Sequence, residues 1–98
     1  MNVIDVHLRL TADTPDSMNF ADTYAGLENI WYKFEADAHG NITMSANADG
    51  FEHLARYFLK MARGRKSDGY HAHHALEFGA DQYADGKELT IEFVADLG

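Results

Sequence analysis

The chain has 98 residues, 46% of them hydrophobic and 12% aromatic, which is enough for one domain over residues 1–98 but not for two. It has no cysteine, which excludes disulfide bonds and cysteine-ligated metal centres, and no run resembling a secretory signal or membrane span, so we expect a cytoplasmic protein that binds no membrane. Sixteen acidic and eight basic side chains give a net charge of −8, which disfavours nucleic acid and suits a basic partner.

Residues 3–10 alternate between apolar and polar side chains, which is the pattern of a half-buried β-strand. Its apolar face would consist of Ile4, Val6, Leu8 and Leu10, and its polar face of Asp5, His7 and Arg9. Residues 11–29 contain the only proline and many polar side chains. We expect one short helical turn among them, near residues 20–27.

A β-hairpin is predicted next. Residues 30–37 and 42–47 each alternate as strands, and Gly40-Asn41 between them can adopt the positive φ angles of a tight turn. Trp31, the only tryptophan, falls on the polar face of the first strand. It would be either an exposed interface anchor or a side chain that residues 11–29 cover.

The strongest local pattern is that of an α-helix. Asp49 is predicted to cap a helix from Gly50 to about Arg63, with Glu52 completing a capping box and Gly64 ending the helix. We expect the following apolar stripe to face the core: Phe51, Leu54, Ala55, Phe58, Met61 and Ala62. His53 would then lie on the solvated side, and the cations near the end of the helix would favour its dipole.

Residues 70–78 read as a strand that carries three of the six histidines. Because side chains alternate along a strand, His71, His73 and Glu77 would share one face, while His74 would point toward the helix. A turn at residues 85–86 would lead into a last strand over residues 88–94.

The element order β-β-β-α-β-β predicts an α+β two-layer sandwich, in which one main helix packs on a five-stranded, largely antiparallel sheet. The open face of that sheet would hold the candidate binding residues Trp31, His71, His73 and Glu77. An exposed, flat polar face of this kind suits a protein partner.

The same histidines support a second interpretation. Two imidazoles two residues apart on a strand could bind a divalent metal, with His7 as the third ligand, or else Glu77 or Glu92. The ordinary alternative is that His71 and His73 hydrogen-bond carboxylates. No phosphate-binding loop, nucleophile elbow or metalloprotease motif is present in the sequence, so we expect no catalytic residue and no organic cofactor.

From residue 45 onward the order of features resembles a family of bacterial immunity proteins of polymorphic toxin systems, immunity protein type thirty-two. The resemblance rests on these segments: Ser45-Ala46-Asn47-Ala48-Asp49-Gly50-Phe51, Leu54-Ala55, Phe58-Leu59, Met61-Ala62, His71-Ala72-His73 and Lys87-Glu88-Leu89-Thr90-Ile91-Glu92. It covers residues 45–92, about half of the chain. It implies a non-catalytic protein that binds a toxin and blocks its activity.

Three functional hypotheses follow. The preferred one is a small acidic binding protein, of the immunity type, whose partner is a basic toxin. The alternative is a metal-binding protein or metal-dependent enzyme that uses the His-x-His pair. The third is a homodimer in which two open sheet faces pack together.

Overall fold

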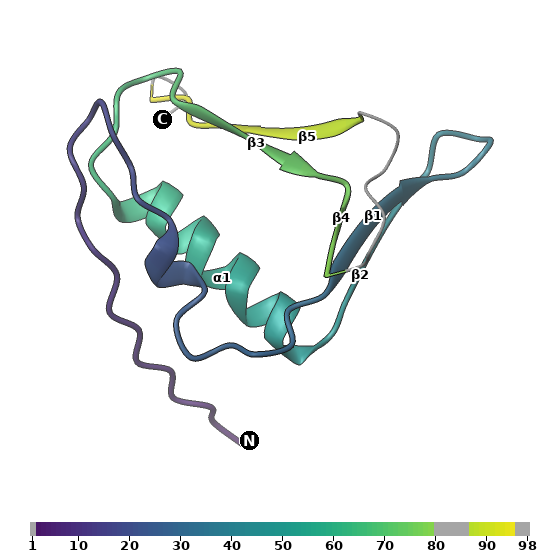
Figure 1. Cartoon of the computed structure of the whole chain (residues 1–98), viewed down its shortest axis with the longest axis horizontal. Helices are drawn as coiled ribbons and strands as arrows, with labels where there is room; N and C mark the ends of the chain where they lie inside the picture. The colour runs from purple at the N-terminus through teal and green to yellow at the C-terminus, as the bar shows by residue number, and fades with distance from the viewer. Residues whose placement is uncertain (1, 80–86, 96–98) are drawn as a thin grey trace.

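Two small antiparallel sheets and, in the described residues, one α-helix make up the computed structural model, which describes residues 2–79 and 87–95 (Figure 1). In chain order the elements are the 3-10 helix η1 (Ala21–Thr23), β1 (Tyr32–Ala36), β2 (Ile42–Ala46), α1 (Ala48–Arg63), β3 (His71–Ala75), β4 (Glu77–Phe78) and β5 (Glu88–Glu92). The α+β class is confirmed. The predicted single five-stranded sheet is wrong, because the strands form one sheet in the order β2-β1-β4 and another in the order β3-β5.

The predicted hairpin is present as β1 and β2. The two strands pair antiparallel from Tyr32 opposite Ala46 to Ala36 opposite Ile42. Gly40 in the connection has a φ of +82°, the left-handed conformation that glycine adopts without strain. The helical turn predicted near residues 20–27 is also present, as η1, which lies against α1.

The strand predicted over residues 70–78 is divided at Leu76. The first part, β3, pairs with β5, whereas the second part, β4, pairs with β1 and places Glu77 opposite Lys33. The backbone N–H of Phe34 donates to the carbonyl oxygen of Leu76 at 2.7 Å, so the chain passes from one sheet to the other at this residue. Glu77 therefore does not share a face with the histidines of β3. The turn predicted at residues 85–86 lies outside the described residues.

The strand predicted over residues 3–10 is not formed. The structure assigns no regular element to residues 2–13, and Ile4 and Val6 are 88% and 68% exposed. Only Leu8 and Leu10 are half-buried, beside Leu59 at the C-terminal end of α1. Alternation identifies the face that a strand would bury, but a strand also needs a neighbour to pair with, and in the described residues this segment has none.

The cap of α1 differs from the prediction. Asn47, not Asp49, is the N-cap, and its side-chain oxygen accepts a hydrogen bond from the backbone N–H of Gly50 at 2.7 Å. The same oxygen accepts from the backbone N–H of Trp31 at 3.1 Å, which ties the start of the helix to the start of β1. A methyl group on Gly50 would stand 2.0 Å from the carbonyl oxygen of Trp31, so only glycine fits there. Gly64 follows the last helical residue, as predicted.

The buried face of α1 is rotated relative to the predicted stripe, of which only Leu54 and Met61 are buried. The residues that it buries are Gly50, His53, Leu54, Tyr57, Lys60 and Met61. Phe51 and Phe58, which the stripe placed in the core, are 54% and 49% exposed. The apolar spacing did not predict the buried face, because segments 11–29 and 70–78 supply polar and aromatic partners that bury polar positions of the helix.

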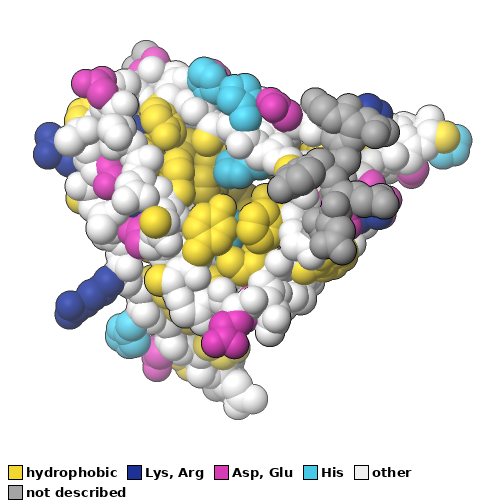
Figure 2. Space-filling view, in the orientation of Figure 1, with side chains coloured by type: hydrophobic (Ala, Val, Ile, Leu, Met, Phe, Trp, Pro, Cys, Tyr) yellow, Lys and Arg dark blue, Asp and Glu magenta, His cyan; other side chains and the backbone are white. Residues whose placement is uncertain are grey.

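The core between α1 and the sheets is small and mainly aromatic. Tyr57 lies between Phe20 and His74, with ring centroids 4.6 Å from each, and Tyr32 stacks on Phe78 at 5.7 Å. Figure 2 shows hydrophobic and histidine side chains in the hollow between α1 and β3–β5. Within residues 2–79 and 87–95 the structure has no helix of the length and apolar character needed to cross a membrane.

Candidate functional site

The outer face of the β3–β5 sheet gathers exposed polar side chains. Alternate residues of the two strands point away from α1 and are exposed: His71, His73, Glu88, Thr90 and Glu92. The residues between them, which include His74 and Ile91, are half-buried on the inner side. Figure 2 shows histidine side chains next to an acidic one over these strands. We call this surface the β3–β5 outer face.

His73 is held by the opposite strand. Its Nδ1 lies 3.0 Å from Oε2 of Glu88 and 3.2 Å from Oγ1 of Thr90. Since a carboxylate can only accept, the contact with Glu88 assigns the ring proton to Nδ1 and leaves a lone pair on Nε2 of the neutral ring. Both side chains are more than half exposed, at 54% and 57%, so this contact contributes little to stability.

His71 has the same orientation for a different reason. Its Nδ1 lies 3.2 Å from the carbonyl oxygen of Gly69, which also can only accept, so Nδ1 donates and Nε2 carries the lone pair. The rings of His71 and His73 are perpendicular, with centroids 5.1 Å apart. The two histidines therefore present hydrogen-bond acceptors beside the carboxylates of Glu88 and Glu92.

Trp31, predicted on the same surface, belongs to the other sheet. It is half-buried directly before β1 and borders a hollow of about 570 Å³. The neighbouring residues of that hollow include Tyr24, Leu27 and Phe78. The prediction that Trp31 shares an open face with His71 and His73 assumed one sheet, and it is wrong because the strands form two sheets.

Glu77 and His7 are also separated from the histidine pair. Glu77 is half-buried on β4, in register with Lys33 of β1. His7 is exposed on the N-terminal segment, which Figure 1 shows on the other side of α1 from β3 and β5. Of the predicted third metal ligands, only Glu92 lies on the β3–β5 outer face, opposite His71 in register. Over the described ranges, no group of three or more His, Cys, Asp or Glu side chains is placed to hold a metal ion.

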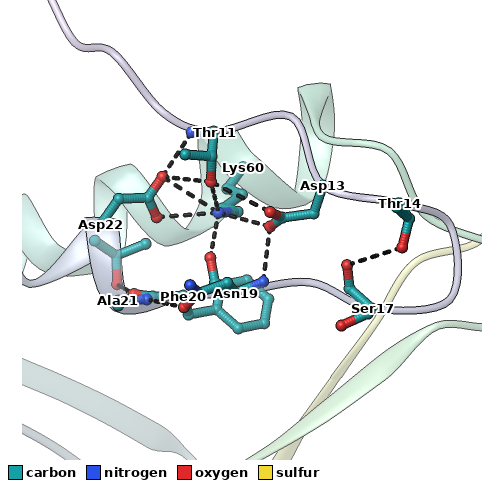
Figure 3. A network of polar contacts seen from close by, with 10 residues as sticks. Thr11, Asp13, Thr14, Ser17, Asn19, Phe20, Ala21, Asp22 and Lys60 are labelled. Carbon is teal, nitrogen blue, oxygen red and sulfur yellow. Dashed lines mark hydrogen bonds and ion pairs between the residues drawn. The ribbon is translucent and has the colours of Figure 1, made fainter.

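The sequence did not predict a buried ionic cluster around Lys60, which was counted among the cations that favour the helix dipole. Lys60 is 1% exposed, and its Nζ lies 2.8 Å from Oδ2 of Asp13, 3.0 Å from Oδ1 of Asp22 and 2.7 Å from Oγ1 of Thr11 (Figure 3). It also donates to the carbonyl oxygen of Asn19. We call these five residues the Lys60 cluster. The available signal was the acidic character of residues 11–29, which hold Asp13, Asp16, Asp22 and Glu28.

The protonation states of the Lys60 cluster favour an anchor over a catalytic group. Burial would lower the pKa of Lys60, but the hydrogen bonds of Asp13 and Asp22 outweigh it and raise that pKa above 10.5. The hydrogen bond from Lys60 lowers the pKa of Asp13. Burial would raise the pKa of Asp22, but hydrogen bonds from Thr11 and Lys60 lower it below 3.8. All three groups therefore stay charged near neutrality and fix residues 11–22 to α1.

Two histidines belong to the core. His53, predicted to be solvated, is 1% exposed, contacts the carbonyl oxygen of Thr23 through Nδ1 at 3.2 Å and stacks on Tyr24 at 4.1 Å. His74 faces α1 as predicted and meets Tyr57 edge to face. Burial lowers the pKa of both imidazoles and raises the pKa of Tyr57 to about 12, so all three groups are neutral at pH 7.

Comparison of the chain with known protein families, with curated proteins and with solved structures found no match in any of the three. Among the described residues, the β3–β5 outer face is the candidate binding surface, because its side chains are exposed to solvent.

Proposed function

We propose that the protein is a small, acidic, non-catalytic binding protein that recognises a basic protein partner through the β3–β5 outer face. The observation that carries the proposal is the gathering of acceptors on one exposed sheet face: the carboxylates of Glu88 and Glu92 and the Nε2 atoms of His71 and His73. Lysine and arginine side chains carry only donors, so they are the natural complement of such a face.

The overall charge supports the same kind of partner. A net charge of −8 attracts a basic protein over a long range and accelerates its approach, while contacts at the face determine how long it stays. A basic toxin, as the resemblance to immunity proteins implies, is the partner that we propose. Binding would block the toxin by covering its surface, a role that needs no reaction on this chain.

The test is a binding measurement against the product of the neighbouring gene, the arrangement that a toxin and its immunity protein would have. We expect the double variant Glu88→Gln/Glu92→Gln to weaken the Kd by about 100-fold, because two charged contacts are lost. Its matched control is Glu35→Gln/Glu52→Gln, which removes the same charge from exposed residues elsewhere and should change the Kd by less than about threefold.

The two variants separate contact from long-range attraction. Equal weakening by both would show that overall charge acts and that the β3–β5 outer face does not make the contact. Wild-type protein that fails to bind this gene product would contradict the toxin partner. Circular dichroism of each variant checks that the fold is kept.

A second candidate function, metal binding, is favoured by the orientation of the two histidines. The carboxylate of Glu88 and the carbonyl of Gly69 hold the Nδ1 protons, which is the outer-sphere arrangement that frees Nε2 for a metal ion. His71 and His73 would be two ligands. Glu92, opposite His71 in register, would have to turn toward them to be the third, because no three such side chains of the described residues are placed together as they stand.

Metal binding is tested by the melting temperature of tag-free protein in EDTA and then with zinc, nickel or iron(II). A ligand that binds only the native state raises the melting temperature, and His71→Ala/His73→Ala should abolish that rise. The matched control His39→Ala removes an exposed histidine from the hairpin turn and should keep it. No rise with any of the metals would contradict this candidate.

A further inference from the structure

The N-terminal segment has the sequence of a strand, but it pairs with no strand within residues 2–79 and 87–95. Its side chains alternate, with Ile4 and Val6 on one side and Asp5 and His7 on the other. Val3, Ile4 and Val6 are 75%, 88% and 68% exposed. Three large apolar side chains so close together in solvent indicate a surface that is covered by a partner.

Elsewhere in the molecule β2 offers an edge of the matching kind. The backbone N–H of Asp37 donates to the carbonyl oxygen of Asn41, and the N–H of Asn47 donates to that of Trp31, so the odd-numbered residues of the second strand face β1. The N–H and C=O groups of the even-numbered residues of β2 therefore point away from β1, and no described strand pairs with them.

The edge of β2 also lacks protection against pairing. Its sequence is Ile-Thr-Met-Ser-Ala, without the lysine, proline or inward charge that usually blocks an exposed edge. Ile42 is 74% exposed at the start of this edge. A strand that joins β2 would satisfy its outward backbone groups, as in other cases of strand addition.

An apolar groove borders this edge. It has a volume of about 280 Å³ and lies between the hairpin and α1. The side chains that line it are Phe34, Met44, Phe51, Leu54, Ala55 and Phe58. Met44 lies on the even-numbered face of β2, so a strand added to β2 would project every second side chain over the groove. Ile4 and Val6 have that spacing.

We propose that two copies of the chain exchange residues 3–7, each segment adding to the β2 edge of the other copy with Ile4 and Val6 over its groove. Reciprocal exchange places the same two surfaces in contact twice, as a two-fold dimer requires. The inference is independent of the β3–β5 outer face, which the exchange leaves open.

The contacts of residues 8–11 favour pairing of residues 3–7 with β2 of a second copy over pairing with β2 of their own chain. Leu8 and Leu10 are half-buried beside Leu59, and the N–H of Thr11 donates to Asp22 at 2.6 Å. These contacts hold residues 8–11 beside α1 and so determine where residues 3–7 begin. Figure 1 shows it leading from there to an N-terminus that lies apart from β2. A second copy can meet residues 3–7 as they stand.

The first test is the mass of the wild-type protein by light scattering, for which we expect twice 11.0 kDa. Ile4→Asp/Val6→Asp should lose the dimer mass, because both side chains that cover the groove become charged. The matched control Asp5→Ser/His7→Ser changes the opposite side of the same segment and should keep it. A monomeric wild-type protein, or a control that dissociates as fully as Ile4→Asp/Val6→Asp, would overturn the proposal.

The second test uses the absence of native cysteine. Asp5→Cys in one tagged copy is mixed with Thr43→Cys or Ser45→Cys in a differently tagged copy, since directly opposed positions on one face are about 5 Å apart. We expect a disulfide-linked pair of copies, and none with Thr90→Cys on the β3–β5 outer face. A chain carrying both Asp5→Cys and Thr43→Cys that closes on itself as a monomer would overturn the exchange, because its own segment would then cover the groove.

Discussion

Replacement of Lys60 by methionine tests whether the Lys60 cluster holds residues 11–22 against the helix. The substitution keeps an unbranched side chain that is one atom shorter, and it removes the charge. Lys60 is 1% exposed, and its ammonium lies within 3.0 Å of carboxylates from both Asp13 and Asp22. Removing one partner of a buried ion pair costs about 3–5 kcal/mol, because the remaining charges are left without compensation.

The lower end of that range is the better expectation for Lys60→Met. The side chains of Asp13 and Asp22 are 16% and 20% exposed, so water can partly solvate them once the cation is gone. A loss of about 3 kcal/mol should lower the urea midpoint by roughly 2 M, at a denaturant slope of about 1.5 kcal/mol/M.

The assay is urea unfolding followed by circular dichroism at pH 7. The matched control is Arg63→Met, which removes an exposed cation one turn later and should change the free energy of unfolding by less than about 0.5 kcal/mol. Equal midpoints for Lys60→Met and Arg63→Met would refute the reasoning, because they would show that the buried cation does not stabilise the fold.

The pH dependence of the same variant gives a second readout. A carboxyl group whose pKa is lowered by folding stabilises the native state above its unfolded pKa, and this stabilisation is lost as the pH falls through the folded pKa. Asp13 and Asp22 are such groups, so their contribution is complete above about pH 4 and lost below it. Lys60→Met should lose less stability than wild type on acidification below pH 4.

Three further predictions concern α1 and the core histidines. Asn47→Ala should cost about 1–2 kcal/mol and Asp49→Ala less, since Asn47 is the cap; the reverse order in urea unfolding would support the cap predicted from the sequence. Gly50→Ala should lower the melting temperature, although helix propensity alone would add about 1 kcal/mol, because its methyl group would meet a backbone oxygen at 2.0 Å; a higher melting temperature would exclude that close contact. His53 and His74 have pKa values lowered by burial, so stability should fall as the pH decreases below 6.5; His74→Phe should flatten this dependence in urea titrations at pH 7 and 5.5, and an unchanged slope would show that His74 does not contribute.

Local signals predicted the elements whose formation depends on nearby residues. The turn residues fixed the hairpin of β1 and β2, and α1 ends at Gly64 as expected. The cap was assigned two residues late because Asn47 and Asp49 are both favourable caps, and the contact of Asn47 with Trp31 depends on a segment 16 residues away.

Features that depend on distant segments could not be read from the sequence. The burial of Lys60 and His53 was missed, although Leu54 and Met61 were placed correctly, because Lys60 and His53 are polar and depend on acceptors that lie 38 and 30 residues away in the chain. Alternation correctly placed His71 and His73 on an exposed face. It could not show that Glu77 lies on another sheet, because a period of two continues unchanged through the break at Leu76.

The break at Leu76 also determines which way the histidines of β3 face. A two-stranded sheet such as β3–β5 has few contacts of its own to prevent a one-residue slip, and such a slip would turn His71 and His73 inward. β4 is held in register by Tyr32 opposite Phe78, and only Leu76 separates it from β3. The β1–β2 hairpin thus fixes the register of β3 through β4. A substitution near Phe78 would therefore change the β3–β5 outer face, although Phe78 does not belong to that face.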